Sequence, residues 1–323
     1  NNKFSGDTLE GDLDFLKEMT TLSYISLDYN AEITGTLPDL SSLSKLEVLA
    51  VPNTGLSGPL PQSLSQLKEL RLLFLDDNAF TGSTDMIQSM PNLTHVYLED
   101  NQFDGTIDDT FFADLKNLVH LDVSNCSFSG KVPGHLFNLP SLQVLDMSLN
   151  NLDGQLPAEA LSNVNASNLQ FLSLHTNKIS GPIPSSIKNL ENLATLDLSL
   201  NQFSGVMPKE IGGLKFVNIL FLGRNSFTPG PAPAWLRNMT QLTELSLKRA
   251  SLTETIPKWL GELTNLLYLD LGENDLTGEI PQTLNSLADI MVLILNKNLL
   301  TGQLGLGQLS YLGKSTNHDR SFC

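Results

Sequence analysis

A leucine pattern that returns about every 24 residues is the feature that most constrains the fold of this 323-residue chain. The pattern reads L-x-x-L-x-L-x-x-N. Its twelve copies begin at Leu22, Leu46, Leu70, Leu93, Leu118, Leu142, Leu169, Leu193, Val217, Leu242, Leu266 and Ile290. A segment of this length cannot bury its own leucines, but stacked segments can share one continuous core. The sequence therefore predicts a solenoid, whose copies are called rungs and numbered one to twelve.

The first eight positions of each rung have the alternation of a short β-strand. Positions 4 and 6 are apolar and are expected to point into the core. Positions 3, 5, 7 and 8 are expected to face solvent on one side. Neighbouring strands in a parallel sheet lie about 4.8 Å apart, so twelve rungs form a curved ribbon roughly 55 Å long.

Position 9 is predicted to hold the rungs together. It is Asn at Asn30, Asn78, Asn101, Asn150, Asn177, Asn201, Asn225, Asn274 and Asn298. The other three rungs have Thr54, Cys126 and Ala250 there. An Asn amide offers one acceptor and two donors, which suit backbone groups left unpaired where a strand ends. Loss of one such Asn should cost about 1–3 kcal/mol, and Ala250 must manage without it.

A second motif, (Leu/Ile/Phe)-x-Gly-x-(Leu/Ile/Val)-Pro, follows the Asn. Clear copies occupy residues 56–61, 179–184 and 276–281. Glycine permits a turn that a Cβ would strain, and proline fixes φ and removes a hydrogen-bond donor. The motif predicts an extended leg on the convex side, followed by a short 3₁₀-like segment.

The Leu-x-Gly-x-Ile-Pro motif at 24-residue spacing resembles the plant-specific class of leucine-rich repeat. That class occurs in ectodomains of plant receptor-like kinases and in polygalacturonase-inhibiting proteins. The resemblance covers residues 2–309. It implies an α/β leucine-rich-repeat solenoid, a right-handed superhelix with a concave parallel β-sheet and a convex side of 3₁₀ or short helices and extended segments. It also implies an extracellular or cell-surface protein whose concave face binds a peptide, a small hormone or a partner protein.

One domain is expected over residues 1–323. It would consist of a partial repeat at 1–21, twelve repeats from 22 to 313 and an incomplete C-terminal cap at 310–323. Relatives of this class carry a Cys pair in each terminal cap, whereas here Cys323 is the last residue. We therefore expect the chain to be a piece of a longer protein, in which a transmembrane anchor could follow.

Charge and hydropathy exclude several classes of partner. The net charge is −16, from 35 acidic and 19 basic residues, which argues against nucleic acid and anionic membranes. The chain has no run of 18 apolar residues that could insert into a bilayer and no charged-then-apolar leader. Two cysteines provide no disulfide framework.

Four N-glycosylation sequons begin at Asn92, Asn125, Asn165 and Asn238. Asn92 and Asn238 both precede a strand, at what we interpret as matching points of their rungs. Asn165 lies in the one rung of 27 residues, in a predicted convex or lateral bulge. These three sites are expected to carry glycan. Asn125 is a less favourable acceptor, because it lies on the concave strand beside Cys126, which is predicted to be a buried thiol.

The open positions of the rungs form the candidate binding surface, where aromatic side chains are suited to interfaces. The candidate ligand-binding residues are Tyr24, Tyr29, Phe74, Asp76, Asp77, His95, Tyr97, Glu99, Asp100, His120, Asp122, Phe171, His175, Phe221, Arg224, Lys248 and Arg249. Acidic residues gather in rungs three to five, and Arg224, Lys248, Arg249 and Lys297 lie in rungs nine to twelve. A protein or peptide ligand with a basic part and an acidic part would match this charge gradient.

Catalysis and metal binding find little support in the sequence. Ser, His and Asp share the concave face, but an open sheet supplies neither a buried orienting acid nor an oxyanion hole. The acidic residues could suit Ca²⁺, and His95, His120 and Asp122 a transition metal, but neither set has a metal-binding spacing motif. We predict a non-enzymatic recognition domain without cofactor or metal. The alternative is a secreted structural, adhesive or cell-wall-associated protein, including an inhibitor of a secreted enzyme. The oligomeric state is not indicated.

Overall fold

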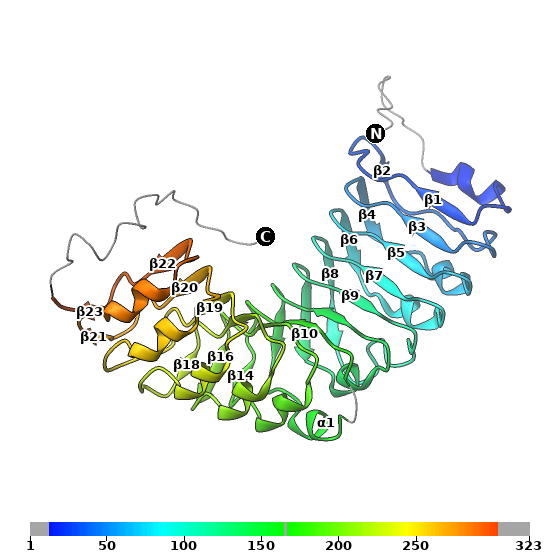
Figure 1. Cartoon of the computed structure of the whole chain (residues 1–323). Coiled ribbons are helices and arrows are strands. Elements are labelled where there is room, and N and C mark those ends of the chain that lie inside the picture. The colour runs from blue at the N-terminus through cyan, green and yellow to red at the C-terminus, as the bar shows by residue number, and fades with distance from the viewer. Residues whose placement is uncertain (1–12, 165–166, 303–323) are drawn as a thin grey trace.

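The computed structural model describes residues 13–164 and 167–302, which form a curved solenoid (Figure 1). One continuous sheet of twelve parallel strands takes one strand from each rung. In order they are β1 Tyr24–Ser26, β3 Val48–Ala50, β5 Leu72–Phe74, β7 His95–Tyr97, β9 His120–Asp122, β11 Val144–Asp146, β13 Phe171–Ser173, β15 Thr195–Asp197, β17 Ile219–Phe221, β19 Glu244–Ser246, β20 Tyr268–Asp270 and β22 Val292–Ile294. Each strand covers positions 3 to 5 and pairs with the same positions of the next rung. The predicted solenoid and its strand register are confirmed.

The extended legs also pair with one another, which the sequence analysis did not predict. A six-stranded sheet contains β2 Thr34–Gly35, β4 Gly55–Pro59, β6 Ala79–Gly82, β8 Gln102–Ile107, β10 Ser127–Lys131 and β12 Asn151–Asp153. It is followed by β14 Ser180–Gly181, β16 Gln202–Gly205 and β18 Ser226–Phe227, and then by β21 Thr277–Gly278 and β23 Leu299–Leu300. The motif glycine adopts a positive φ, for example 77° at Gly58 and 76° at Gly181, which confirms the predicted turn.

The legs thus form three separate sheets, with one break between β12 and β14, at the 27-residue rung, and another between β18 and β21. The motif changes only at the second break. In rung nine Pro229 takes the place of the glycine, and a proline has no N–H to donate to a neighbouring strand. In rung ten Glu254 takes that place with a φ of 65°. Only isolated bridges, between Gly230 and Leu252 and between Thr255 and Thr277, are described between β18 and β21.

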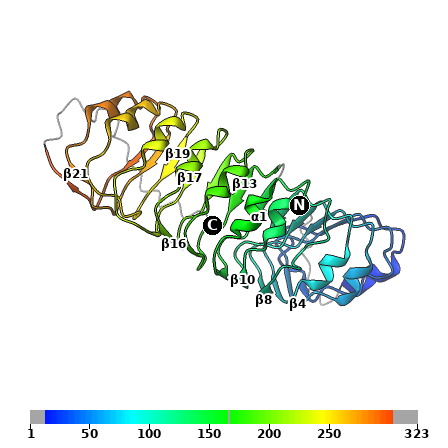
Figure 2. The same ribbon diagram turned by 90° about the horizontal axis from the view of Figure 1, so that it is seen from below.

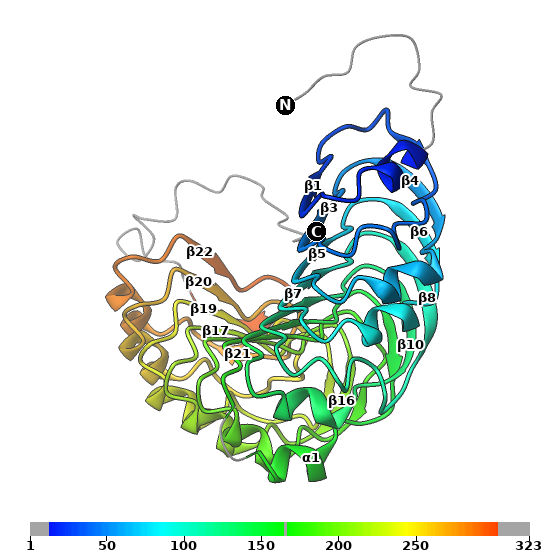
Figure 3. The ribbon, with the colours of Figure 1, turned by 90° about the vertical axis from the view of Figure 1, so that its right-hand side faces the viewer.

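Short helices form the return legs and lie along the outer edge of the arc (Figures 2 and 3). The 3₁₀ helices are η1 Leu13–Glu18, η2 Gln62–Gln66, η3 Asp85–Ser89, η4 Gly134–Asn138, η5 Ser185–Asn189, η6 Lys209–Gly213, η7 Ala234–Asn238, η8 Lys258–Glu262 and η9 Gln282–Ser286. The 27-residue rung has an α-helix instead, α1 Ala158–Ser162. Seven of the 3₁₀ helices follow a proline with extended φ and ψ, such as Pro184 before η5. The predicted 3₁₀-like segments are therefore confirmed.

The position-9 Asn residues hold the rungs together as predicted. Asn101 Nδ2 donates to the carbonyl oxygens of Leu75, Leu98 and Glu99 at 2.8, 3.0 and 3.1 Å, and its Oδ1 accepts the N–H of Phe80 at 2.9 Å. One amide thus pairs backbone groups of two rungs. In rung ten Ala250 has no such amide, and its N–H is accepted by Asn274 Oδ1 of the next rung at 2.9 Å.

A second row of asparagines, which the sequence analysis missed, stands immediately before position 1. Each side chain donates to a carbonyl oxygen of the preceding rung. The bonds are Asn92 to Lys68 at 2.9 Å, Asn117 to Pro91 at 3.1 Å, Asn168 to Pro140 at 2.7 Å, Asn192 to Ser167 at 2.6 Å and Asn265 to Thr240 at 2.8 Å. The signal was the dipeptide Asn-Leu that opens these rungs.

Some predictions fall on residues outside the described ranges. They are the start of the partial repeat at 1–12, the sequon residue Asn165, the end of rung twelve and the proposed cap with Cys323. Within the described ranges, no helix is long and apolar enough to cross a membrane.

Candidate functional site

The concave sheet offers two rows of side chains. Positions 3, 5 and 7 stand on or just after the strands. Position 8 follows in the left-handed backbone region in all twelve rungs, with φ between 46° and 57°, so the chain turns sharply there. This second row contains Tyr29, Asp77, Asp100, Arg224 and Arg249 from the predicted set. The candidate residues therefore divide between the face of the sheet and one edge of it.

Six positions that were expected to face solvent are buried instead. They are Ala50, Ser148, Ser173, Gly223, Asp270 and Gly272. Ser173, for example, lies between Asp146 and Asp197 of the adjacent strands. On the inner side of a curve, larger neighbours close over a small side chain, so these positions support the surface rather than form it.

An aromatic stack crosses rungs three to five. The Phe74 and Tyr97 ring centroids lie 4.9 Å apart with an interplanar angle of 20°, and those of Tyr97 and His120 lie 4.3 Å apart at 28°. His95 stacks on His120 at 6.1 Å. The parallel register brings these side chains together, because Phe74 pairs with Tyr97 and His95 with His120 on adjacent strands. All four residues belong to the candidate set predicted from the sequence.

Carboxylates lie beside the aromatic stack without a facing cation. Burial, followed by the charge of Asp122, raises the pKa of Glu99 to about 9. Burial, followed by the charge of Asp146, raises the pKa of Asp122 to about 6. Burial also raises the pKa of Asp76, with Asp77 and Asp100 contributing. Among the described residues, Glu99 Oε2 is buried with no hydrogen-bond partner. At neutral pH Glu99 therefore holds a proton in place of a counter-charge.

The two histidines do not neutralise these acids. Burial, followed by the charge of His95, lowers the pKa of His120 to about 4. Burial also lowers the pKa of His95. Both imidazoles are consequently neutral near pH 7, and the cluster stays acidic.

Asp122 has a structural task that the sequence analysis did not assign. It belongs to a set of position-5 aspartates whose Oδ1 accepts the backbone N–H two residues later. The bonds are Ser124 to Asp122 at 2.9 Å, Ser148 to Asp146 at 2.9 Å, Ser199 to Asp197 at 2.8 Å and Gly272 to Asp270 at 2.8 Å. Asp122 Oδ1 therefore stabilises the backbone where the strand ends, and Oδ2 is the oxygen that can face the neighbouring carboxylates.

The remaining aromatic candidates are separate from this stack. Tyr24 and Tyr29 in rung one are 60% and 70% exposed. Phe171 and His175 are half-buried in rung seven, where His175 Nδ1 lies 2.9 Å from Thr176 Oγ1. Phe221 meets Tyr268 edge-on at 6.2 Å. Tyr268 occupies open position 3 of rung eleven and is not among the candidate residues predicted from the sequence.

The basic residues of rungs nine to twelve surround a carboxylate. Lys248 Nζ lies 3.6 Å and Lys297 Nζ 3.7 Å from Glu273 Oε1. Burial works to raise the pKa of Glu273, but the combined charges of Lys297, Lys248 and Arg224 bring it below its usual value. Arg224 and Arg249 remain exposed. The predicted basic end is present, but part of its charge is paired within the protein.

The structure corrects the comparison of the sequons. Asn92 stands in the turn before β7 and belongs to the second asparagine row, whereas Asn238 is the last residue of η7. They are not at matching points of their rungs. Asn125 Nδ2 donates to Asp100 Oδ1 on the concave edge.

Cys126 takes the ladder position as predicted, with Sγ 3.4 Å from the carbonyl oxygen of Leu98. Burial raises the pKa of the Cys126 thiol to about 12, so it stays protonated. Within the described residues, no group of three or more His, Cys, Asp or Glu side chains is arranged to hold a metal ion.

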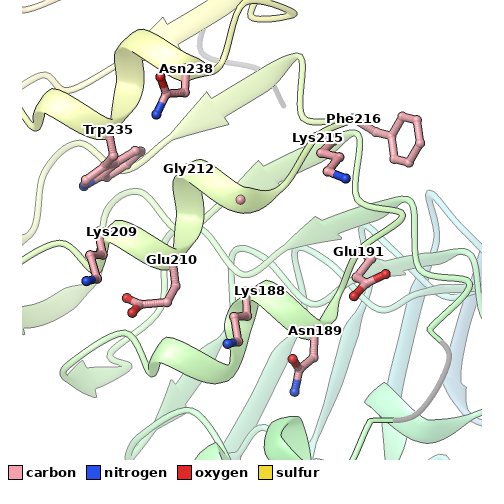
Figure 4. A pocket seen from close by; sticks show the side chains of 11 residues that line it. Lys188, Asn189, Glu191, Lys209, Glu210, Gly212, Lys215, Phe216, Trp235 and Asn238 are labelled. Atoms are coloured by element: carbon pink, nitrogen blue, oxygen red, sulfur yellow. The ribbon is translucent and has the colours of Figure 1, made fainter.

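A hollow of about 870 Å³ lies on the helical side, between η5, η6 and η7 (Figure 4). Its lining includes Lys188, Gly212, Phe216, Trp235 and Asn238. The sequence analysis did not anticipate it. The available signal was a pair of glycines, Gly212 and Gly213, at helix positions where the neighbouring rungs carry large polar side chains.

Comparisons with known families agree with this architecture. The model of a "Leucine-rich repeat region" matches residues 131–267, and models of a "Leucine rich repeat" match residues 91–152 and 265–287. Receptor-like protein 39 of Arabidopsis thaliana is 32% identical over 166 residues, covering 50% of this chain and 18% of that protein. The receptor-like kinase TMK2 of the same plant is 32% identical over 164 residues, covering 49% and 18%. The chain therefore spans less than a fifth of the length of these relatives.

Solved structures with the same fold include plant receptors and a leucine-rich-repeat protein of Leptospira interrogans. The Arabidopsis receptor kinase HAESA, solved with the peptide hormone IDA and the co-receptor SERK1, superposes with a TM-score of 0.75 at 32% identity. The match covers 90% of this chain and 52% of that one. A TDR receptor superposes with a TM-score of 0.79 at 26% identity, covering 90% and 54%. The match thus covers about half of each of these solved chains.

Proposed function

Since the chain belongs to the leucine-rich-repeat family, with plant receptor-like proteins among its relatives, we propose that it recognises an extracellular peptide or protein through its concave face. It would do so as part of a cell-surface receptor-like protein, acting by binding rather than by catalysis. HAESA, to which it is similar, was solved with a peptide hormone and a co-receptor. That likeness supports a peptide as the first ligand class to test.

The observation that carries the proposal is the aromatic stack beside uncompensated carboxylates. Phe74 and Tyr97 present half-exposed rings next to Glu99, whose Oε2 has no partner among the described residues. A fold gains nothing from burying like charges together, since each raises the cost of ionising the next. A ligand cation over Tyr97 would supply both a cation–π contact and the missing counter-charge.

The charge gradient sets the length and polarity of the ligand. From the acidic rungs to Arg249 in rung ten the sheet spans seven strand spacings, or about 34 Å, which an extended peptide covers with about ten residues. One end of that peptide would carry Arg or Lys to face rungs three to five. The other would carry Asp, Glu or a free carboxylate to face the exposed Arg224 and Arg249.

The proposal can be tested by immobilising the chain and selecting binders from a library of synthetic peptides of ten to fourteen residues. Peptides with a basic and an acidic end should be enriched over uncharged peptides of equal length. The joint replacement of Phe74, Tyr97 and Asp100 by Ala should abolish that enrichment, with only a small fall in Tm because all three side chains are partly exposed. Enrichment that survives this replacement would contradict the concave assignment. It would favour a structural or adhesive protein that acts through another surface.

A further inference from the structure

The helical side of rungs eight to ten contains a hollow whose origin is visible in the sequence. Position by position, η5 presents Lys188 and Asn189, η6 presents Gly212 and Gly213, and η7 presents Arg237 and Asn238. The middle rung therefore lacks two side chains that its neighbours have. The resulting space of about 870 Å³ lies in the range of about 300–1,000 Å³ typical of small-ligand sites.

Trp235 closes one side of this hollow. It lies half-buried against η6, where a Cβ added to Gly212 would lie only 3.1 Å from Trp235 Cβ and 3.4 Å from Cε3 of the indole. The missing side chain at Gly212 thus lets Trp235 approach the neighbouring helix. By contrast, a Cβ added to Gly213 would meet nothing within 4 Å, so the hollow is open beside it.

Asn238 stands on the same face as Trp235. Side chains at i and i+3 eclipse one another in a 3₁₀ helix, and these residues are three apart within η7. Figure 4 shows both among the side chains around the hollow. Asn238 is exposed and begins the sequon Asn238-Met239-Thr240. Among the described residues its amide has no hydrogen-bond partner, whereas the amides of Asn92 and Asn125 are bonded.

We propose that Asn238 is N-glycosylated and that the first sugars of its glycan pack on Trp235 in the hollow between η6 and η7. In the transfer, a bond forms between Asn238 Nδ2 and C1 of the first N-acetylglucosamine. The bond from C1 to the phosphate of a polyprenyl-diphosphate-linked oligosaccharide breaks, Nδ2 loses one proton, and the lipid diphosphate leaves. The glycan keeps one N–H on Nδ2, so the acceptor remains planar and anchored to η7.

The chemistry of the hollow suits a sugar. An indole offers a flat apolar face to the C–H groups of a pyranose ring. Around it, Glu210, Lys209 and Asn189 supply the polar groups that sugar hydroxyls and the acetamido group need. The covalent link also holds the sugar beside Trp235, so weak contacts suffice to keep it there. The glycan would cover the helical side of these rungs and leave the concave face free.

Occupancy is the first test. The chain is secreted from a eukaryotic host with a signal peptide supplied, and glycopeptides are analysed by mass spectrometry. The proposal requires glycan on Asn238 in the protein and in Thr240→Ser, which keeps the sequon, and none in Thr240→Ala. An unmodified Asn238 in the secreted protein would overturn it.

The second test reads the packing on Trp235. The chain has two tryptophans, so Trp259→Phe leaves Trp235 as the sole indole reporter. Acrylamide quenching of this variant should fall by roughly half relative to the same protein with Thr240→Ala, because stacking covers one of the two indole faces. Equal quenching would show a glycan that extends into solvent, and would overturn the packing.

The third test uses stability and the open space beside Gly213. Glycosylation at Asn238 should raise Tm by on the order of 1–3 °C, and the increment should vanish with Trp235→Phe or Gly213→Gln, the second of which fills the hollow. A Cβ at position 213 meets no heavy atom within 4 Å, so we expect Gly213→Gln to fold. An increment of equal size in all three backgrounds would contradict sugar packing at this site. These outcomes do not depend on ligand binding at the concave face.

Discussion

Rungs three to five and rungs nine to twelve share the geometry of the concave strands, yet their charges are arranged differently. In the first region Asp76, Glu99 and Asp122 lie together, and no Lys or Arg occupies an open position of rungs two to six. The pKa of each of these acids is raised. In the second region Glu273 lies between two lysines, and its pKa is lowered. In rungs nine to twelve the carboxylate of Glu273 is paired with lysines of the same protein. In rungs three to five the carboxylates have no paired cation, and a binding partner would have to supply one.

The difference shows how a repeat protein can acquire a binding site without altering its fold. The rung needs its leucines, the position-9 Asn and the turn glycine, and leaves the open positions free. Where opposite charges at these positions pair with one another, as around Glu273, the surface needs no external counter-charge. Where they do not, as around Glu99, ionisation of the carboxylates costs stability, and we expect a ligand of opposite charge to recover that loss.

The largest effect is expected from the aromatic stack. Tyr97→Ala removes the ring that contacts both Phe74 and His120, and interface tyrosines of this kind are worth about 2 kcal/mol or more, a loss of roughly 30-fold in affinity. Tyr24→Ala is the matched control: Tyr24 belongs to the candidate set predicted from the sequence, but it lies in rung one, outside the span proposed for the peptide. Binding of a selected peptide is measured by calorimetry. Equal losses of affinity in Tyr97→Ala and Tyr24→Ala would show that the aromatic stack of rungs three to five is not a preferred contact.

A smaller effect is expected from neutralising charges at either end. Asp76→Asn with Asp100→Asn should weaken binding of a peptide with a basic end by roughly tenfold, since charge-assisted hydrogen bonds contribute about 1.5–3 kcal/mol. Arg224→Gln with Arg249→Gln should weaken binding by only a few-fold, because both arginines are exposed to screening solvent. If the second pair proved the more important, the acidic rungs would not be the principal contact.

The dependence of stability on pH should distinguish the regions without any ligand. The pKa of Glu99 is raised from 4.5 to about 9, so its folded form retains a proton, and its contribution to stability is lost as pH rises from about 4.5 through 9. Urea unfolding at pH 4.5 and pH 8 should therefore show that Glu99→Gln is relatively more stable at pH 8. The contribution of His120, which is lost as pH falls from 6.5 through 4, is common to both proteins and cancels. A variant with the same pH dependence as the parent would contradict the burial of an uncompensated Glu99.

The smallest effect is expected in the paired region. Glu273→Gln removes the partner of Lys248 and Lys297, and ion pairs that solvent reaches in this way contribute little to stability. The loss should appear at neutral pH and shrink in high salt. Because the pKa of Glu273 is lowered, its contribution should also fade as pH drops through that pKa. Thermal unfolding at two salt concentrations measures the loss, and a fall in Tm of equal size at both concentrations would show that it does not come from charge pairing.

Most of the fold could be predicted because each rung repeats its physical requirement. The leucine spacing fixed the strands, the position-9 Asn their ladder, and the motif glycine its turn. The pairing of the extended legs into further sheets was missed, because the sequence there shows a turn rather than a strand pattern. The break at Pro229 and Glu254 follows only once that pairing is known.

The sequence predicts which residues of the candidate site lie together, but not which of them are buried or protonated. Strand register alone placed Phe74, Tyr97 and His120 together. Burial is a property of the curved surface, so the protonation of Glu99 and the closure over Ser173 required the structure. The hollow beside Trp235 was also not predicted, because it results from the missing side chains of Gly212 and Gly213 rather than from a motif.

The most direct test of the central claim is proton release on binding. A ligand cation against Glu99 would lower its pKa from about 9, so a protonated carboxyl should ionise and release its proton to the buffer. Calorimetric titration at pH 7.5 in two buffers of different ionisation enthalpy measures that proton. For a selected peptide with an Arg at its basic end, we predict proton release in the parent protein and its loss in Glu99→Gln. Binding with no proton released, or with equal release in both proteins, would contradict the assignment of the acidic rungs as the ligand site.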